Sequence, residues 1–155
     1  MMNPTKVEKS KAITGIWNVI GNRVDKKSYT WNLTKLIDFG ASKDSTRNTF
    51  GGEIIYKTSV NSTVNFSHID LGEVNRGVTE LYVNGNKVGM RWYGKSIYNV
   101  KDYLKVGTNS IEIRYTTVLA NYCKSLDNPI THNWTKKYND KVATGIEGPV
   151  VLLKY

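Results

Sequence analysis

Residues 69–118 read IDLGEVNRGVTELYVNGNKVGMRWYGKSIYNVKDYLKVGTNSIEIRYTTV and carry the clearest fold signal in the chain. At the centre of this stretch stands Asn84-Gly85, a residue pair that tolerates the positive φ angles of a type I′ turn. Apolar and polar residues alternate around it, as in Leu81 and Val83 before the pair and Ile111 and Ile113 after it. Such alternation is typical of antiparallel strands with one buried face, so the stretch predicts a hairpin followed by a further strand.

Outward from this hairpin, short β-rich runs alternate with turn residues along most of the chain. No run places apolar residues at helical spacing over three turns. Many short strands with regular turns predict an all-β fold, either an antiparallel β-sandwich or a barrel. The expected strands cover residues 13–20, 33–39, 52–60, 64–71, 78–83, 87–92, 96–100, 110–119 and 150–153.

The 155 residues are enough to form one hydrophobic core, and we expect a single domain over residues 13–155. Residues 1–12 are polar and aperiodic, which predicts a disordered or cloning-derived tail. No window holds 18 apolar residues, so no membrane span is expected. The N-terminal lysines are not followed by an apolar run of signal-peptide length. The sequence therefore leaves two localisations open: the cytoplasm, or the periplasm or exterior if the chain is a piece of an exported enzyme.

Five motifs stand in an order that resembles a known family. They are Ile16-Trp17, Trp31, FGGEIIY at 50–56, the hairpin stretch at 69–118 and TGIEGPV at 144–150. Their order resembles the galactose-binding-like sugar-binding domain of glycoside hydrolase family 2 and of related rhamnosidase-type enzymes, over about residues 13–155. The resemblance implies a β-sandwich with jelly-roll-like topology rather than a barrel.

The net charge of +9 raises the question of nucleic-acid binding, because phosphate contacts dominate that interaction. Of the 22 basic residues, 17 are lysines and only 5 are arginines, whereas phosphate and base recognition favours the forked guanidinium group. Most of the lysines are spread singly, as on a solvated surface. We therefore expect no nucleic-acid partner.

Glycoside hydrolysis needs two carboxylates facing each other across the scissile bond. Asp70, Asp102 and Glu147 fall in turns, and the strand glutamates fall at positions expected to face outward. In the resembling enzymes the catalytic acids lie on a separate barrel domain. We therefore expect no catalytic residues and no enzyme activity from this chain by itself.

Metal and cofactor signals are weak. Two histidines 64 positions apart and one cysteine give no zinc spacing, so no metal ligands and no cofactor are expected. Cys123 fits a buried small residue better than a nucleophile served by His132. A structural calcium ion is compatible with the resembling sandwiches, but oxygen-ligand sites of that kind leave little trace in a sequence, and no ligands are assigned.

Proteins bind sugars through aromatic faces combined with a few polar groups. One stretch after the hairpin and one polar, aromatic-rich segment at 121–148 supply this mixture. The candidate carbohydrate-binding residues are Arg91, Trp92, Tyr93, Tyr98, Asn121, His132 and Trp134. Trp92 and Tyr98 could equally be packing residues, and Trp134 is the tryptophan expected to be most exposed. The resemblance implies that both stretches lie at one end of the sandwich, toward a catalytic domain.

Two functions remain open at this point. The first is a non-catalytic carbohydrate-binding or accessory domain of a glycoside hydrolase. The alternative is a protein-interaction module that docks a catalytic domain or partner chain. The sequence does not separate them, because protein interfaces and sugar-stacking surfaces use the same Trp, Tyr and Arg side chains.

Overall fold

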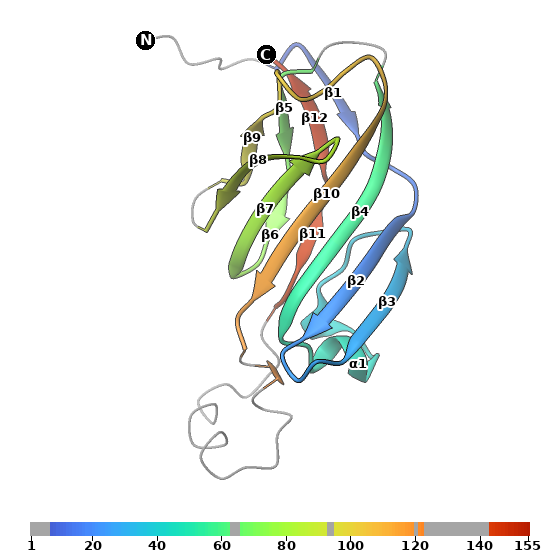
Figure 1. Ribbon diagram of the computed structural model, residues 1–155, viewed down its shortest axis with the longest axis vertical. Helices are drawn as coiled ribbons and strands as arrows, with labels where there is room; N and C mark the ends of the chain where they lie inside the picture. Colours follow the sequence, from blue (N-terminus) through green and yellow to red (C-terminus); the bar gives the residue numbers. More distant parts are fainter. Residues whose placement is uncertain (1–6, 63–65, 93–94, 120, 123–142) are drawn as a thin grey trace.

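Two antiparallel sheets form the body of the protein in a computed structural model, which describes residues 7–62, 66–92, 95–119, 121–122 and 143–155 (Figure 1). The larger sheet has six strands in the order β3 (Ser28–Leu33), β2 (Trp17–Arg23), β4 (Gly52–Ser62), β10 (Gly107–Thr117), β7 (Gly77–Val83) and β8 (Asn86–Arg91). The smaller sheet has four, in the order β1 (Lys9–Ala12), β12 (Val151–Lys154), β5 (His68–Asp70) and β9 (Ile97–Asn99). The predicted all-β antiparallel sandwich is confirmed.

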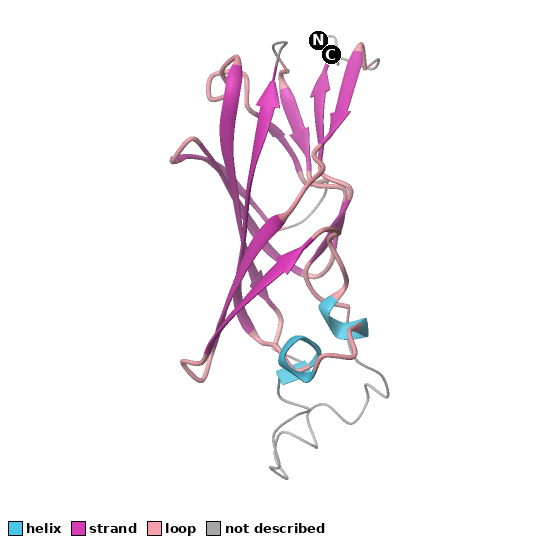
Figure 2. Ribbon diagram, turned by 90° about the vertical axis from the view of Figure 1, so that its right-hand side faces the viewer, coloured by secondary structure: helices cyan, strands magenta, loops and turns pink. Residues whose placement is uncertain are grey.

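Smaller elements complete the fold. A two-stranded ladder pairs β11 (Ile146–Gly148) with β6 (Glu73–Val74). A 3₁₀ turn, η1 (Phe39–Ala41), and one turn of helix, α1 (Ser45–Asn48), lie at one end of the sandwich (Figure 2), while the C-terminus lies at the other (Figure 1). Among the described residues, no helix has the length and apolar character needed to cross a membrane.

The central strand β10 shows how the core forms. Its alternate side chains Ile111, Ile113 and Tyr115 are fully buried. On one side they pair with Val83, Leu81 and Thr79 of β7, and on the other with Thr58, Tyr56 and Ile54 of β4. Directly opposed residues share a face of the sheet, so these ladders place one apolar layer against the smaller sheet. The predicted burial of Leu81, Val83, Ile111 and Ile113 is confirmed.

The hairpin between β7 and β8 turns at Asn84-Gly85, as the sequence predicts. Both residues have positive φ angles, 51° and 82°, which are the values a type I′ turn requires. The ladder then shifts register, since Leu81 pairs with Gly89 but Tyr82 pairs with Lys87. Val88 is the extra residue of this β-bulge, and bulges change the direction in which the following side chains point.

Two expectations about strand positions are wrong. Residues 33–39 do not form a strand, because the strand β3 ends at Leu33 and the following residues turn into η1. Asp38 accounts for the difference: its Oδ1 accepts hydrogen bonds of 2.8 Å from the backbone N–H groups of Gly40 and Thr144. These bonds replace a ladder, while Leu36 and Phe39 still enter the core.

The second wrong expectation concerns the tail predicted over residues 1–12. Its last four residues form the strand β1, which pairs with β12. All four β1 side chains are exposed. An edge strand without a buried face shows no apolar alternation, so only the backbone pairing reveals it.

Candidate functional site

A pocket opens where the ends of β7 and β8 meet the segments leading into β7 and β9. We call it the Arg91 pocket; its volume is about 220 Å³. Its lining residues are Val74, Asn75, Arg76, Gly77, Thr79, Arg91, Trp92 and Ser96. The larger sheet supplies Arg91 and Thr79, while Ser96 immediately precedes a strand of the smaller sheet. The pocket therefore lies at an open edge of the sandwich.

Strand register places Arg91 in this pocket. Arg91 pairs with Thr79 across the β7–β8 ladder, and Thr79 is buried on the inner face of the larger sheet. Because opposed residues share a face, the Arg91 side chain extends from the inner face at the sheet edge. The hydroxyl of Tyr98 lies 2.8 Å from Thr79 Oγ1 and 3.1 Å from the Thr79 carbonyl oxygen. This buried contact joins the two sheets directly beneath Arg91.

The Arg91 guanidinium is held in place by two contacts. Its Cζ atom lies 4.9 Å from the centroid of the Tyr98 ring, a cation–π geometry. One terminal nitrogen donates a 3.1 Å hydrogen bond to the Met90 carbonyl oxygen. Tyr98 is 1% exposed, and burial raises the pKa of its phenol. Tyr98, a predicted sugar-binding residue, is therefore a packing residue that positions Arg91.

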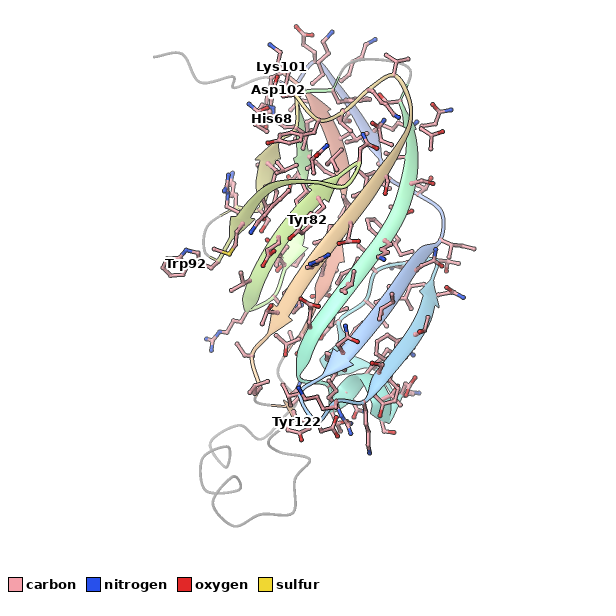
Figure 3. All side chains as sticks on the ribbon, in the orientation of Figure 1. His68, Tyr82, Trp92, Lys101, Asp102 and Tyr122 are labelled. Carbon is pink, nitrogen blue, oxygen red and sulfur yellow. The ribbon has the colours of Figure 1, made fainter. Side chains whose placement is uncertain are left out.

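Trp92 follows Arg91 and projects from the edge of the sandwich into solvent (Figure 3). The side chain is 69% exposed, so of the two readings of this residue, core packing is wrong. Met90, two residues earlier, is 49% exposed. Met90, Arg91, Trp92 and Lys95 together line a second shallow hollow of about 370 Å³ beside the Arg91 pocket. Large exposed apolar side chains beside polar ones are typical of binding surfaces.

The opposite wall of the pocket comes from the link between β6 and β7. The amide nitrogen of Asn75 donates hydrogen bonds to the Gly145 carbonyl (3.1 Å) and to Glu147 Oε2 (3.0 Å). The carbonyl oxygen of Arg76 accepts a hydrogen bond from the hydroxyl of Tyr115. Both wall residues are thus fixed to the core. Asn75 and Arg76 are not among the site residues predicted from the sequence. Their local signal is that they form a polar pair just before the apolar strand expected at 78–83.

An adjoining pocket of about 580 Å³ shares Val74 and Ser96 with the Arg91 pocket. Asp70, Glu73 and Lys95 contribute its charged groups. Asp70 Oδ1 accepts a 2.9 Å hydrogen bond from the Gly72 backbone, which caps the end of β5. The surface near Arg91 therefore combines a cationic pocket with a neighbouring pocket of mixed charge.

Asn121, another predicted site residue, does not join Arg91 and Trp92. The side chain is 1% exposed and donates a 3.2 Å hydrogen bond to Thr144 Oγ1. Its neighbour Tyr122 lies at the end of the sandwich that carries α1, whereas Trp92 lies on the side edge (Figure 3). The expectation that both stretches form one end is wrong for these residues. Tyr93, His132 and Trp134, like Cys123, lie outside the described residues.

Several carboxylates in the described ranges make local structural contacts. Glu112 pairs with Arg114 (2.8 Å) and Lys57 (3.6 Å) on the outer face of the larger sheet, and Glu80 lies 3.5 Å from Lys87. In the part of the chain that the structure describes, no group of three or more His, Cys, Asp or Glu side chains could hold a metal ion. These carboxylates thus have structural partners, and the binding groups that the Arg91 pocket offers are polar and aromatic side chains.

No protein-family model and no curated protein matches the sequence. Solved structures do match the fold. A rhamnosidase from Novosphingobium sp. PP1Y superposes with a TM-score of 0.76 at 22% identity, over 97% of this chain and 16% of that chain. A β-glucuronidase of Faecalibacterium prausnitzii gives a TM-score of 0.62 at 13% identity, covering 98% of this chain and 32% of that chain.

A GH2 β-galacturonidase from Eisenbergiella tayi gives a TM-score of 0.63 at 15% identity, covering 96% of this chain and 25% of that chain. The chain therefore spans 16% to 32% of the length of these three structures. At these identities the likeness shows a shared fold: the β-sandwich of this chain also occurs as one part of larger glycoside hydrolases.

Proposed function

We propose that this β-sandwich is a non-catalytic carbohydrate-binding domain that acts as an accessory unit of a glycoside hydrolase. The observation that carries the proposal is Trp92, which stands 69% exposed beside the polar Arg91 pocket. An exposed indole next to placed polar groups suits a sugar ring, because the apolar C–H face stacks on the aromatic ring while hydroxyls reach hydrogen-bonding groups.

Each pocket residue has a distinct role in this proposal. Trp92 stacks on the ring, the Arg91 guanidinium and the amide oxygen of Asn75 bind hydroxyls, and Tyr98 holds Arg91 in place. Tyr93, which follows Trp92 in sequence, stays a predicted contributor. His132 and Trp134 stay predicted contributors from the separate segment at 121–148.

The fold supports the accessory role. The matching structures are named as a rhamnosidase, a β-glucuronidase and a β-galacturonidase, and this chain corresponds to at most 32% of any of these three. A domain of this kind concentrates the enzyme on its substrate or orients the catalytic domain. Fold alone does not imply function, so the proposal depends on the pocket and not on the likeness.

Calorimetric titration of the chain with a panel of oligosaccharides tests the assignment. We expect dissociation constants on the order of micromolar to millimolar, because a small sugar buries few atoms and displaces well-bound water. Trp92→Ala should weaken binding at least about tenfold and change the free energy of unfolding by less than about 1 kcal/mol, since the side chain is exposed.

Trp17→Ala is the matched control, because Trp17 is 3% exposed and its ring lies edge-on to Tyr56 at 6.4 Å between centroids. This change should cost roughly 3 to 5 kcal/mol of stability. If Trp92→Ala leaves sugar binding intact, the site is wrongly placed.

Absence of glycosidase activity is a separate expectation. The chain should release no aryl group from aryl-glycosides, because glycoside hydrolysis requires a facing carboxylate pair. Hydrolysis that disappears when a single Asp or Glu is changed to Ala would contradict the non-catalytic assignment.

The second candidate is a docking module for a catalytic domain or partner chain. Met90 and Trp92, 49% and 69% exposed, favour it because they lie at the end of the edge strand β8. Exposed aromatic and Met side chains are enriched in the centres of protein interfaces. Mixing experiments with a purified catalytic domain separate the two functions: docking predicts that Trp92→Ala weakens the protein complex, and sugar binding predicts that free oligosaccharide binds without any partner.

A further inference from the structure

We propose that the Arg91 pocket selects sugars that carry an anionic substituent, either a carboxylate or a sulfate ester. The inference rests on the proposed function and names the class of sugar for the same site.

Ion pairing divides the arginines of this chain into two groups. Of the five, Arg23, Arg47 and Arg114 pair with Asp25 (2.6 Å), Asp44 (3.6 Å) and Glu112 (2.8 Å). The other two, Arg76 and Arg91, line the same pocket, and neither forms an ion pair with any described residue. Both are exposed. The two arginines that form no ion pair with a described residue therefore line the same pocket.

The outer face of the larger sheet shows the opposite arrangement. There Glu112 contacts both Arg114 and Lys57, and Glu80 contacts Lys87 and accepts a 2.9 Å hydrogen bond from the Tyr82 hydroxyl. The charges on that face compensate one another. Among the described residues, no carboxylate forms an ion pair with Arg76 or Arg91, and Glu147 contacts the pocket wall through Asn75 Nδ2 at 3.0 Å. The two unpaired arginines favour an external anion there.

Neighbouring charges set the extent of this positive surface. Lys95 adds a third cation in the hollow beside Trp92, and it forms no ion pair with the described residues. Asp70 and Glu73 line the adjoining pocket and are not among the residues that line the Arg91 pocket. The anionic group of a ligand therefore belongs on the arginine side of the site.

The Arg91 guanidinium is already oriented before a ligand arrives. The Tyr98 ring lies 4.9 Å from its Cζ atom, and one hydrogen bond of 3.1 Å joins it to the Met90 carbonyl. The remaining N–H donors are available for a forked contact with two oxygens of a carboxylate or sulfate, and little side-chain entropy is lost in forming it.

The size of the pocket suits one sugar residue. Its volume of about 220 Å³ lies below the range typical of sites that enclose drug-sized ligands. We infer that a single acidic residue enters the pocket while the rest of a glycan remains outside it.

Calorimetric titration of the full chain with four probes of similar size tests the inference: trigalacturonate, its methyl ester, a sulfated galactose oligosaccharide and neutral galactotriose. We expect an acidic probe to bind at least about tenfold more tightly than its neutral counterpart, with the preference decreasing as salt is added. Preference for the carboxylate or for the sulfated probe identifies which anionic group the site takes.

Three variants each remove one positive charge. Arg91→Gln and Arg76→Gln should each weaken binding of the preferred acidic probe by about tenfold more than they weaken binding of the neutral probe. Arg114→Gln, on the outer face, is the matched control and should leave both unchanged. Arg76→Gln keeps the test valid if Arg91→Gln disturbs the contact with Tyr98, and thermal melting of each variant verifies folding.

Equal affinity for acidic and neutral probes, together with loss of both in Trp92→Ala, would overturn the anion preference and leave the proposed function standing. Equal weakening by Arg114→Gln and Arg91→Gln would also overturn it, because it would indicate a response to net charge only. If no probe of either class binds, both the proposed function and this inference fail.

Discussion

Asn109 shows how one buried polar side chain stabilises the hairpin region. It is fully buried, and its Oδ1 accepts hydrogen bonds from Lys105 N (2.9 Å) and Asn84 Nδ2 (3.0 Å). Its amide nitrogen donates to the carbonyls of Lys105 (2.8 Å) and Gly107 (3.2 Å). Asn84, at the hairpin tip, also accepts from Ser110 N at 2.9 Å. The two asparagines therefore join the β7–β8 turn to the loop before β10.

Asn109→Ala should lower the free energy of unfolding by about 3 kcal/mol, because the Lys105 N–H and the carbonyls of Lys105 and Gly107 lose a hydrogen-bond partner at once. Asn86→Ala, an exposed asparagine at the start of β8, is the control and should change it by less than about 0.5 kcal/mol. Denaturant unfolding measures both. Equal effects of the two changes would show that the Asn109 network contributes nothing beyond its surroundings.

Two glycines at the ends of strands differ in what surrounds them. Gly85 in the β7–β8 turn has a φ of 82°, and a Cβ atom placed there would meet nothing within 4 Å. Gly52, at the start of β4, has a φ of 145°, and a Cβ atom there would lie 2.2 Å from the Asn22 carbonyl oxygen of β2. The first glycine serves only the turn conformation. The second allows two central strands to approach each other.

Alanine at these two positions should therefore have unequal effects. Gly85→Ala should cost about 1 kcal/mol, the penalty of a left-handed conformation for a residue with a Cβ atom. Gly52→Ala should cost more than about 3 kcal/mol or prevent folding, because the clash is with backbone that is held in a ladder. Circular dichroism melting curves compare them, and a Gly52→Ala protein as stable as Gly85→Ala would contradict the packing of β2 on β4.

Three buried tyrosines connect separate parts of the whole molecule through their hydroxyls. Tyr56 of β4 accepts a 3.1 Å hydrogen bond from the backbone of Ile146 in β11, and Tyr115 of β10 donates to the Arg76 carbonyl. Tyr98 contacts Thr79 across the two sheets at 2.8 Å. Burial raises the pKa of all three phenols, that of Tyr115 to about 12.

The raised pKa values of these phenols determine how the free energy of unfolding changes at alkaline pH. The unfolded chain loses phenolic protons near pH 10, whereas the folded chain retains these protons to higher pH. The unfolded state then binds fewer protons than the native state, so the free energy of unfolding falls as pH rises from 10 toward 12. Melting temperatures measured across this range should decline, and more shallowly in Tyr115→Phe, which has one buried phenol fewer. An equally steep decline in that variant would rule out the contribution of Tyr115.

Local sequence signals predict part of this structure well. The Asn84-Gly85 turn, the alternating burial of β7 and β10 and the all-β class follow from turn conformation and the two-residue period of a strand. These local signals fail where a segment has no two-residue period. The strand β1 has no buried face, and in residues 33–39 hydrogen bonds to the Asp38 side chain replace the hydrogen bonds of a strand ladder. Tyr98, on a strand of three residues, gave no local sign of its burial.

The candidate site likewise has one part that follows from the sequence and one part that depends on the tertiary structure. The sequence by itself determined that an arginine and a tryptophan follow the hairpin, because the turn defines where β8 ends. Only the tertiary structure decided that Asn75 and Arg76 face them, that Tyr98 supports them from beneath, and that Asn121 lies elsewhere. These relations depend on pairing between strands distant in the chain and on the packing of one sheet on the other, and neither leaves a periodic trace among neighbouring residues.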